Sequence, residues 1–225
     1  VSFRWFTGAL ENPAFRDSFY LSLEIAAVTV ALGLLLAVPA SVALYRGSRR
    51  VRNLVRIAAI GPLIVPEVLL ALGLLILFNS QIALGSGITA MVAGHLLVAM
   101  PLAIQVLLAG MASVEPNLEQ AAWTLGASRL RAFWSVTMPA LAPAIASAAV
   151  FMFIFSFDNV SISLFLSSPG QTTLPIQMYQ YLEYRADPTI AAMSTILVGI
   201  GILAAIILGR LGSLGQLAGA GRKPR

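Results

Sequence analysis

The sequence predicts an all-α integral membrane protein with five membrane-spanning helices. Hydrophobic residues make up 59% of the 225 positions, and charged residues make up only 10%. A soluble domain carries about a quarter charged residues, so this chain could not cover its own surface with polar groups. Five apolar stretches are long enough for a bilayer crossing, which takes about 20 residues of helix. They are residues 21–44, 57–78, 88–112, 138–157 and 190–208.

The positions of the basic residues predict how these helices are oriented in the membrane. Most of the 14 basic residues follow the first, third and fifth apolar stretches, and only Arg4, Arg16 and Arg185 lie elsewhere. Cytoplasmic segments of membrane proteins carry an excess of arginine and lysine. We therefore expect the N-terminus outside and the C-terminus in the cytoplasm. The same clustering explains the net charge of +5 without a nucleic-acid partner.

These assignments divide the chain into three parts. An external segment (1–19) precedes a transmembrane domain (20–211), which contains a cytoplasmic loop (113–139) and is followed by a basic cytoplasmic tail (212–225). No signal peptide precedes the external segment. Two interpretations therefore remain open: a short tail that crosses the membrane unaided, or a chain cut just after a preceding membrane helix.

Glu67 and His95 are ionisable side chains well inside the predicted spans, whereas Glu24 stands at the entry to the first span. Glu67 follows Pro66 in the second span, where a carboxylate is costly unless it is paired or hydrated. It is either a structural residue, hydrogen-bonded to carbonyls that the proline leaves free, or part of a pathway through the membrane. His95 is the only histidine in the chain and lies in the third span. We expect it to bond a neighbouring carbonyl and to have a structural role.

The outer end of the fourth span carries Asp158 and Asn159. Asp158 is either a solvated carboxylate at the membrane interface or a group that meets a cationic substrate. Together with Glu67, these two residues are the candidates for a substrate pathway. Further along, Pro169-Gly170 predicts a turn. Thr173 is a candidate N-cap for a short helix at the membrane interface that contains residues 176–184.

Several kinds of chemistry are excluded by what the sequence lacks. The chain has no cysteine, so neither a disulfide nor a thiolate metal site can form. It has no glycine-rich phosphate loop, and its only lysine is Lys223 in the tail. Paired-histidine and serine-hydrolase motifs are absent too. We expect no catalytic residue, no metal site and no bound cofactor, so a transport function would need an energy source on another chain.

The loop between the third and fourth spans is polar and helix-prone, although it lies between two long apolar stretches. Bacterial ABC importer permeases carry a cytoplasmic loop of the form E-A-A-x3-G-x9-I-x-L-P, and this loop resembles it at the same spacing. Gln120, Ala121 and Ala122 stand at the E-A-A positions, and Gly126 follows three residues later. The motif ends with Val136, Thr137, Met138 and Pro139. Glutamine replaces the acidic residue of the motif, but Glu119 directly precedes it.

The resemblance extends over nearly the whole chain and is to the spermidine/putrescine branch of type I importers. Residues 3–6, 24–26 and 156–175 also look like this branch, in which a further membrane helix usually precedes the equivalent of Val1. The resemblance therefore favours the second interpretation, a five-helix transport core that lacks a preceding first helix. The resemblance implies that residues 116–125 form a short helix that docks into a groove of an ATP-binding subunit. Small Ala121 and Ala122 would let the helix sit deep in that groove, and Trp123 would anchor it there.

The resemblance also implies partners and a location. ATP and Mg²⁺ would bind a dimer of ATPase subunits, and a second permease subunit and a periplasmic binding protein would complete the importer in the bacterial inner membrane. A homodimer and a heterodimer of permeases both remain open. A polyamine or a similar amine is the first choice of substrate. Iron, thiamine, phosphonate, an opine or 4-aminobutyrate are alternatives, and a membrane scaffold without transport activity is an alternative of another class.

Overall fold

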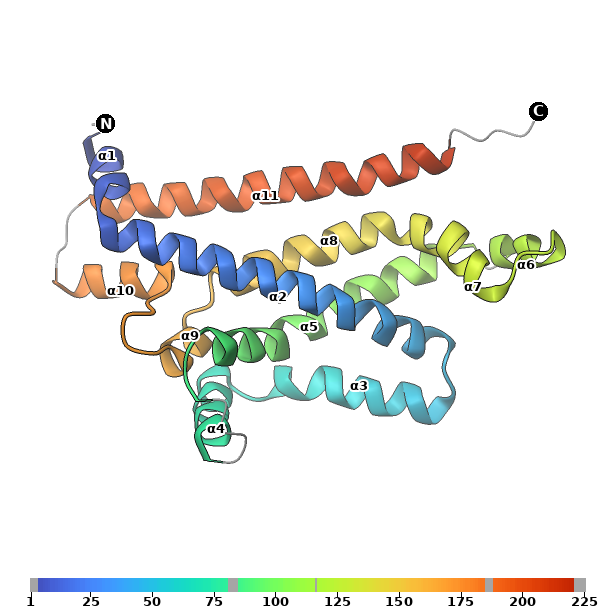
Figure 1. Ribbon diagram of the computed structural model, residues 1–225, viewed down its shortest axis with the longest axis horizontal. Helices are drawn as coiled ribbons and strands as arrows, with labels where there is room; N and C mark the ends of the chain where they lie inside the picture. The colour runs from blue at the N-terminus through green and yellow to red at the C-terminus, as the bar shows by residue number, and fades with distance from the viewer. Residues whose placement is uncertain (1–3, 81–84, 116, 185–187, 221–225) are drawn as a thin grey trace.

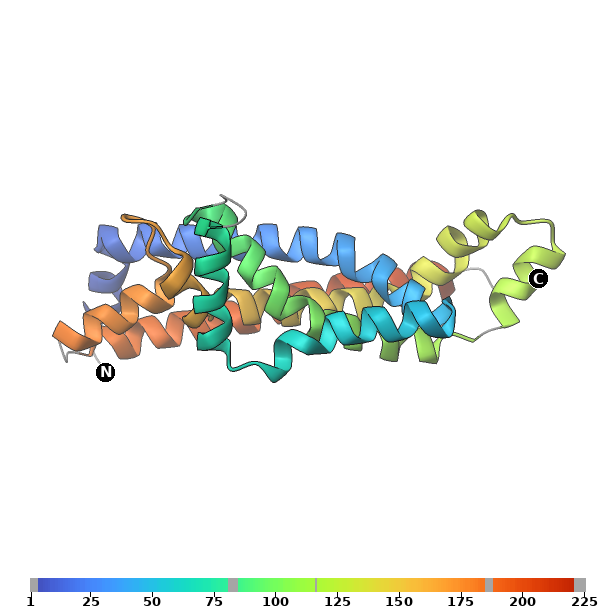
Figure 2. The same ribbon diagram turned by 90° about the horizontal axis from the view of Figure 1, so that it is seen from below.

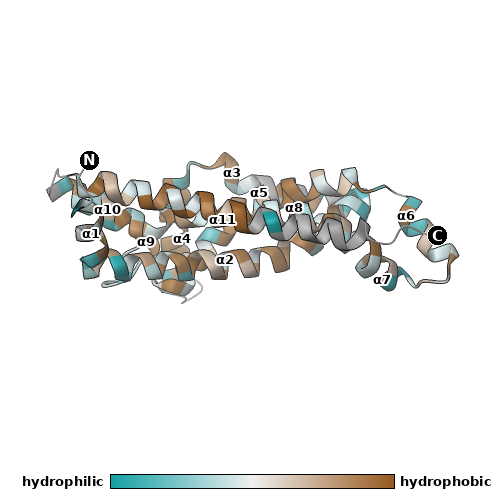
Figure 3. Ribbon diagram, turned by 90° about the horizontal axis from the view of Figure 1, so that it is seen from above, coloured by the Kyte–Doolittle hydropathy of each residue, from teal (hydrophilic) through white to brown (hydrophobic). Residues whose placement is uncertain are grey.

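The computed structural model of the chain describes residues 4–80, 85–115, 117–184 and 188–220, and this part of the chain is built from helices. The long helices lie along one axis, and the two termini lie at opposite ends of that axis (Figure 1). Hydrophobic residues dominate the long helices, whereas hydrophilic residues are concentrated towards the two ends (Figure 3). This distribution is the one expected for a helical bundle with lipid around its middle.

Four helical segments of the described residues are long and apolar enough to cross a membrane. They confirm four of the five predicted spans as helices, and the first and last helices are longer than predicted. The number of spans and their orientation in a membrane remain predictions. The four helices are α2 (Pro13–Arg46), α5 (Ile88–Ser113), α8 (Met138–Phe157) and α11 (Thr189–Ala220).

The second predicted span is wrong as a single helix. Residues 57–78 are divided between α3 (Arg49–Ile64) and α4 (Glu67–Ser80). Val65, between the two, has an extended backbone with ψ 132°. The ring of Pro66 disfavours the helical region for the residue before it, which explains the break. Figure 1 shows α4 turned sharply away from the direction of α3.

The segment between the first and third predicted spans nevertheless runs back along the bundle. In Figure 1, α2 and α5 run in the same direction, and α3 runs back beside them. Contacts of α3 with both α2 and α5 fix it there.

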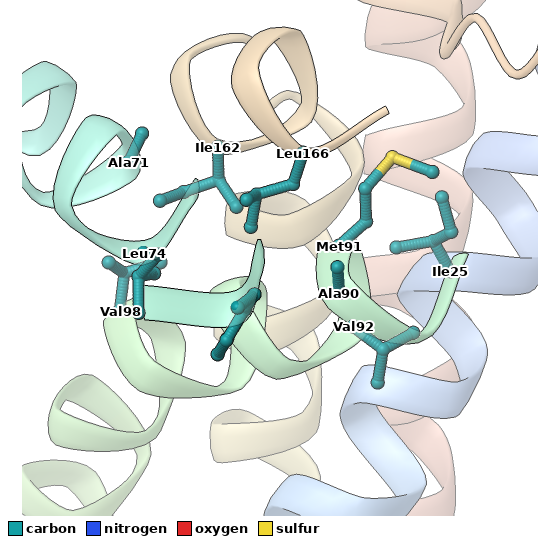
Figure 4. Packing of buried hydrophobic residues seen from close by; sticks show 10 residues of the cluster. Ile25, Ala71, Leu74, Ala90, Met91, Val92, Val98, Ile162 and Leu166 are labelled. Atoms are coloured by element: carbon teal, nitrogen blue, oxygen red, sulfur yellow. The ribbon is translucent and has the colours of Figure 1, made fainter. Parts of the chain in front are cut away.

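The core lies where α2, α5 and α8 pack against one another. Gly110 on α5 permits a close approach, because a Cβ atom built there would lie 2.3 Å from the Cβ of Ala144 on α8. Small residues let the backbones of membrane helices approach closely in this way. Figure 4 shows the neighbouring cluster, in which Leu74 of α4, Met91 of α5 and Ile162 of α9 (Ser161–Leu166) pack together.

The end of the bundle at which α2 begins is closed by α1 (Arg4–Glu11) and α10 (Leu174–Tyr184), which pack on α11 and α2. The turn predicted at Pro169-Gly170 is confirmed, and Gly170 has a φ of +81°. Thr173 directly precedes α10, but its buried hydroxyl has no hydrogen-bond partner, so the side-chain cap expected from it is not formed. Instead, the backbone N–H of Leu174 donates to the Ser22 hydroxyl at 2.8 Å.

Candidate functional sites

The loop with the E-A-A-like motif forms a compact helical element at one end of the molecule. It consists of α6 (Asn117–Thr124), a turn, α7 (Arg129–Ala132) and the π-helical turn η1 (Phe133–Thr137), which leads directly into α8. The expected short helix and the turn at Gly126 are confirmed, and Pro116 lies outside the described residues. Gly126 has a φ of +87°, a conformation that favours glycine. We call residues 117–137 the loop element.

The loop element exposes an unusual amount of apolar side chain beyond the ends of the long helices. Figure 2 shows α6 and α7 extending past the bundle at the end where α2 finishes. Leu125 is 89% exposed, and Gln120 and Ala121 are exposed as well. Large apolar side chains gathered on a protruding surface mark an interaction site. The other large exposed apolar residues of the element are Leu118, Trp123, Leu130 and Trp134.

Glu119 and Gln120 have different surroundings. Glu119 faces its own chain, where Nη2 of Arg46 lies 2.5 Å from its Oε1 and the Thr137 hydroxyl donates to the same oxygen. Burial raises the pKa of Glu119, but the hydrogen bonds from Thr137 and Arg46 and the charge of Arg46 outweigh it and lower the pKa overall. Gln120 is exposed. Gln120, which stands at the position of the motif's acidic residue, is therefore the one of these two side chains that a partner protein can reach.

Trp123 has a neighbour within the element. The guanidinium of Arg129 lies 5.8 Å from the centre of its ring, and the side chain keeps 40% of its surface exposed. A cation over the face of an indole ring is a favourable contact. The ring is thus held in place on the protruding surface while part of it stays accessible.

The structure brings two of the three pathway candidates together. The side-chain amide of Asn159, in the connection between α8 and α9, donates to Glu67, 92 positions earlier in the chain. Asn159 is 6% exposed, and its Oδ1 accepts at 2.9 Å from the N–H of Ile162 in the first turn of α9. Glu67 does not lie deep in a continuous span, as predicted, but is the first residue of α4. A helix N-terminus stabilises a carboxylate there.

Asp158 faces a different part of the molecule. It is exposed and lines a groove of about 360 Å³ between α8, α10 and α11. The walls of the groove are mostly apolar and include Phe153 and Phe157, whose rings are stacked with centroids 5.4 Å apart. A carboxylate beside aromatic rings is suited to hold an organic cation. Glu183 lies near the end of α10, and the neighbouring Arg185 and Asp187 lie outside the described residues.

His95 is a structural residue, but its partners differ from the expected backbone carbonyl. Its Nδ1 lies 2.7 Å from the hydroxyl of Ser156 on α8, and its Nε2 lies 3.0 Å from the hydroxyl of Ser163 on α9. All three side chains are at most 3% exposed. One ring thus joins α5, α8 and α9 through buried hydrogen bonds.

We predict that His95→Leu destabilises the protein. The substitution keeps a similar volume but leaves two buried hydroxyls without their partner, at about 1–3 kcal/mol for each group. The midpoint of thermal unfolding of the detergent-purified protein should fall clearly. Ser147→Ala is the control, because its hydroxyl bonds only the Pro143 carbonyl of its own helix on an exposed face. An equal loss in both variants would contradict the role of the network.

Sequence reasoning missed several residues of these sites. Arg46 contributed only to the charge count, and Thr137, Ser156 and Ser163 carry no local signal because hydroxyl residues are common in membrane helices. Each acquires its role through contacts between segments far apart in the chain. The motif spacing, by contrast, located the short helix α6 and the turn at Gly126.

Comparison with known proteins links the geometry to a family. Residues 29–213 match the model of the family described as binding-protein-dependent transport system inner membrane component. The chain is 32% identical over 209 residues to the putrescine transport system permease protein PotI of Escherichia coli (strain K12), with 90% of this chain and 74% of PotI covered. The spermidine/putrescine permease protein PotC of the same strain is 24% identical, with 90% and 76% covered.

Another relative is named for a different substrate. The molybdate/tungstate transport system permease protein WtpB of Pyrococcus abyssi is 30% identical over 210 residues, with 92% of this chain and 83% of WtpB covered. Among solved structures, the inward-facing MetNI methionine ABC transporter matches with a TM-score of 0.74 at 17% identity, covering 88% of this chain and 94% of that chain. A bacterial importer of alginate matches with the same TM-score at 17% identity, covering 95% and 84%. These structures support the fold.

Proposed function

The chain belongs to the family of binding-protein-dependent transport system inner membrane components, and we propose that it is the permease subunit through which ATP hydrolysis on a separate chain drives the import of a polyamine. A permease of this family is not an enzyme. The energy of ATP must therefore reach the chain through a protein contact, and the loop element supplies a surface for it.

The support for this contact is the exposed apolar surface of the loop element. Gly126 ends α6 at the motif position, and Ala121 and Gln120 are exposed beside it. Leu125 and Trp123 add apolar side-chain surface that stays exposed in the described part of the chain. We propose that α6 inserts into a groove of an ATPase subunit, which would hold ATP and Mg²⁺, and that closure of two such subunits moves the long helices.

The remaining partners follow from the family. A binding-protein-dependent system includes a solute-binding protein, and one alginate importer was solved in complex with its periplasmic binding protein. We propose that this chain pairs with a second, different permease subunit, and that the binding protein docks at the end of the bundle formed by α1 and α10.

The distribution of charge favours a cationic substrate. Residues 57–128 and 132–184 contain no lysine or arginine, whereas Glu67 and Asp158 lie in these segments. An oxyanion such as molybdate would need cationic groups or other strong donors in its pathway. PotI and PotC are named for putrescine and spermidine, which carry positive charge. Because WtpB is named for molybdate and tungstate, an oxyanion is the second candidate for the substrate.

The groove at Asp158 is suited to one end of such an amine. An ammonium group would meet the Asp158 carboxylate, and the stacked rings of Phe153 and Phe157 lie beside it. The methylene chain of a diamine would contact the apolar walls formed by Met178 and Leu197. Glu67, held by Asn159 and the start of α4, would be a second carboxylate along the pathway.

Reconstitution of the complete importer tests the proposal. The chain would be co-expressed with its ATPase subunit and its second permease subunit, placed in proteoliposomes and supplied with the binding protein. Uptake of labelled putrescine, 4-aminobutyrate and molybdate would be measured with and without ATP. We expect ATP-dependent uptake of putrescine. ATP-dependent uptake of molybdate alone would support the oxyanion candidate, and failure of the chain to retain any ATPase subunit would contradict the proposal.

A further inference from the structure

Three side chains far apart in the sequence fasten the loop element to the first long helix. Arg46 is the last residue of α2, Glu119 lies in the first turn of α6, and Thr137 is the last residue of η1. Arg46 Nη2 lies 2.5 Å from Glu119 Oε1 and 3.3 Å from Thr137 Oγ1. The Thr137 hydroxyl also donates to Glu119. We call these residues the Arg46 cluster.

The carboxylate end of the cluster is shielded from water, whereas the guanidinium end is not. Thr137 is 3% exposed and the side chain of Glu119 keeps 15% of its surface accessible, while the side chain of Arg46 keeps 39%. Exposed ion pairs contribute little, because water screens the charges and both side chains lose freedom. Here the loss of Arg46 would leave the shielded carboxylate of Glu119 without its compensating charge. The cluster can therefore hold α2, α6 and η1 in a fixed arrangement.

Arg46 contacts both ends of the π-helical turn. Besides Thr137, its guanidinium lies over the ring of Phe133, 5.6 Å from the centroid, and Phe133 is the first residue of η1. A π-helical turn has a wider hydrogen-bonded ring than an α-helical turn and is frequently found at functional sites. Here the turn joins α7 to α8. The orientation of α6 and α7 relative to α8 is thus set at η1, and Arg46 contacts both ends of η1.

We infer that Arg46 and Glu119 are positioning residues that transmit movement of α6 to α2 and α8, while the exposed face of α6 makes the contact with the ATPase subunit. The inference rests on the proposed function, because it takes α6 as the docking helix. It separates docking from transmission. Residues that face the partner determine whether the subunits bind, whereas the Arg46 cluster determines whether binding and closure move the long helices.

The test compares assembly, ATP hydrolysis and uptake in the complete importer. The variants are Arg46→Gln and Glu119→Gln, which remove one charge each with little change of size. We expect both to retain the ATPase subunit during purification and to hydrolyse ATP, while putrescine uptake per ATP falls about tenfold, which corresponds to about 1.4 kcal/mol. Glu115→Gln is the matched control, because the same charge is removed from an exposed residue of the same loop.

Charge exchange tests whether the pair itself matters. Arg46→Glu combined with Glu119→Arg restores opposite charges, so uptake should recover to well above that of either reversal alone. Thr137→Val keeps both charges and the shape of the side chain but removes the hydroxyl, and a smaller loss of coupling is expected. A further measurement, stimulation of ATP hydrolysis by the binding protein, needs no knowledge of the solute and should fall in the same variants.

Three results would overturn the inference. One is wild-type uptake and wild-type stimulation in both Arg46→Gln and Glu119→Gln. Another is loss of the ATPase subunit in proportion to the loss of uptake, which would make the cluster part of the docking surface. The third is failure of every variant, Thr137→Val included, to assemble, which would reduce the cluster to a folding role. Absence of ATPase binding in the wild-type chain would instead refute the proposed function.

Discussion

Ala122→Arg should abolish ATP-dependent uptake while the protein still inserts into the membrane. Ala122 lies in α6 at the second alanine of the motif and is partly exposed. An arginine there would hold α6 away from any groove that accepts two alanines, and an unpaired charge would be buried on docking. We expect uptake to fall by at least about a hundredfold, the effect of about 2.7 kcal/mol, and co-purification of the ATPase subunit to fall with it.

Ala14→Arg is the matched control for this substitution. Ala14 is an exposed residue at the start of α2, at the end of the bundle opposite the loop element. The same charge and bulk there should leave the ATPase contact unchanged. Membrane insertion of both variants would be measured by extraction and gel filtration. Normal uptake by Ala122→Arg would mean that α6 does not dock as proposed.

Asp158→Asn should reduce uptake of putrescine about tenfold, because loss of an ion pair in a partly enclosed groove costs about 1–2 kcal/mol. The amide keeps the shape of the carboxylate, so the change isolates the charge. 4-Aminobutyrate carries the same terminal ammonium group, so any uptake of this solute should fall as well. The measurement is initial uptake by the reconstituted importer at several concentrations of each solute.

The control for the charge is Asp17→Asn. Asp17 is exposed at the outer end of α2, 3.7 Å from Arg16, where an ion pair contributes little. Putrescine uptake should stay at the wild-type level in this variant. Unchanged uptake of putrescine in Asp158→Asn would remove Asp158 from the substrate pathway.

The parts of the fold that could be predicted from the sequence are the helices whose formation the lipid environment requires. A helix in hydrocarbon must satisfy its own backbone groups, so a long apolar stretch becomes a helix whatever its neighbours are. The boundaries of α5 and α8 therefore agree with the apolar stretches at 88–112 and 138–157. At Pro66 the same reasoning fails, because mean hydropathy is insensitive to a single ring that stops the helix.

Among the candidate sites, only the loop element could be predicted, because a local sequence motif marks it. The spacing from Gln120 to Pro139 located the loop element, including the turn at Gly126. The contact between Glu67 and Asn159 joins segments 92 positions apart, and no periodicity in a single sequence reports such a pair. Arg46 was informative only as a cytoplasmic charge, since its role depends on where α6 and η1 end in space.

The π-helical turn is the feature that the sequence predicts least. Phe133, Trp134 and Val136 would fit equally well into an α-helix, and nothing in their order indicates an extra residue in the turn. The turn is held by contacts from outside it, through Arg46 at both ends and Glu119 at Thr137. Tertiary contacts of this kind override local preference.

Cross-linking from Gln120 tests most directly whether the loop element faces an ATPase subunit. The chain has no cysteine, so Gln120→Cys introduces its only thiol, and Gln120 is exposed on α6. With a short bifunctional thiol reagent and an ATPase subunit carrying single cysteines along its groove, we expect a covalent adduct whose yield changes when ATP binds. Ala14→Cys should give none. Absence of an adduct from Gln120→Cys in an assembled, ATP-hydrolysing importer would contradict the assignment of the loop element as the site of coupling.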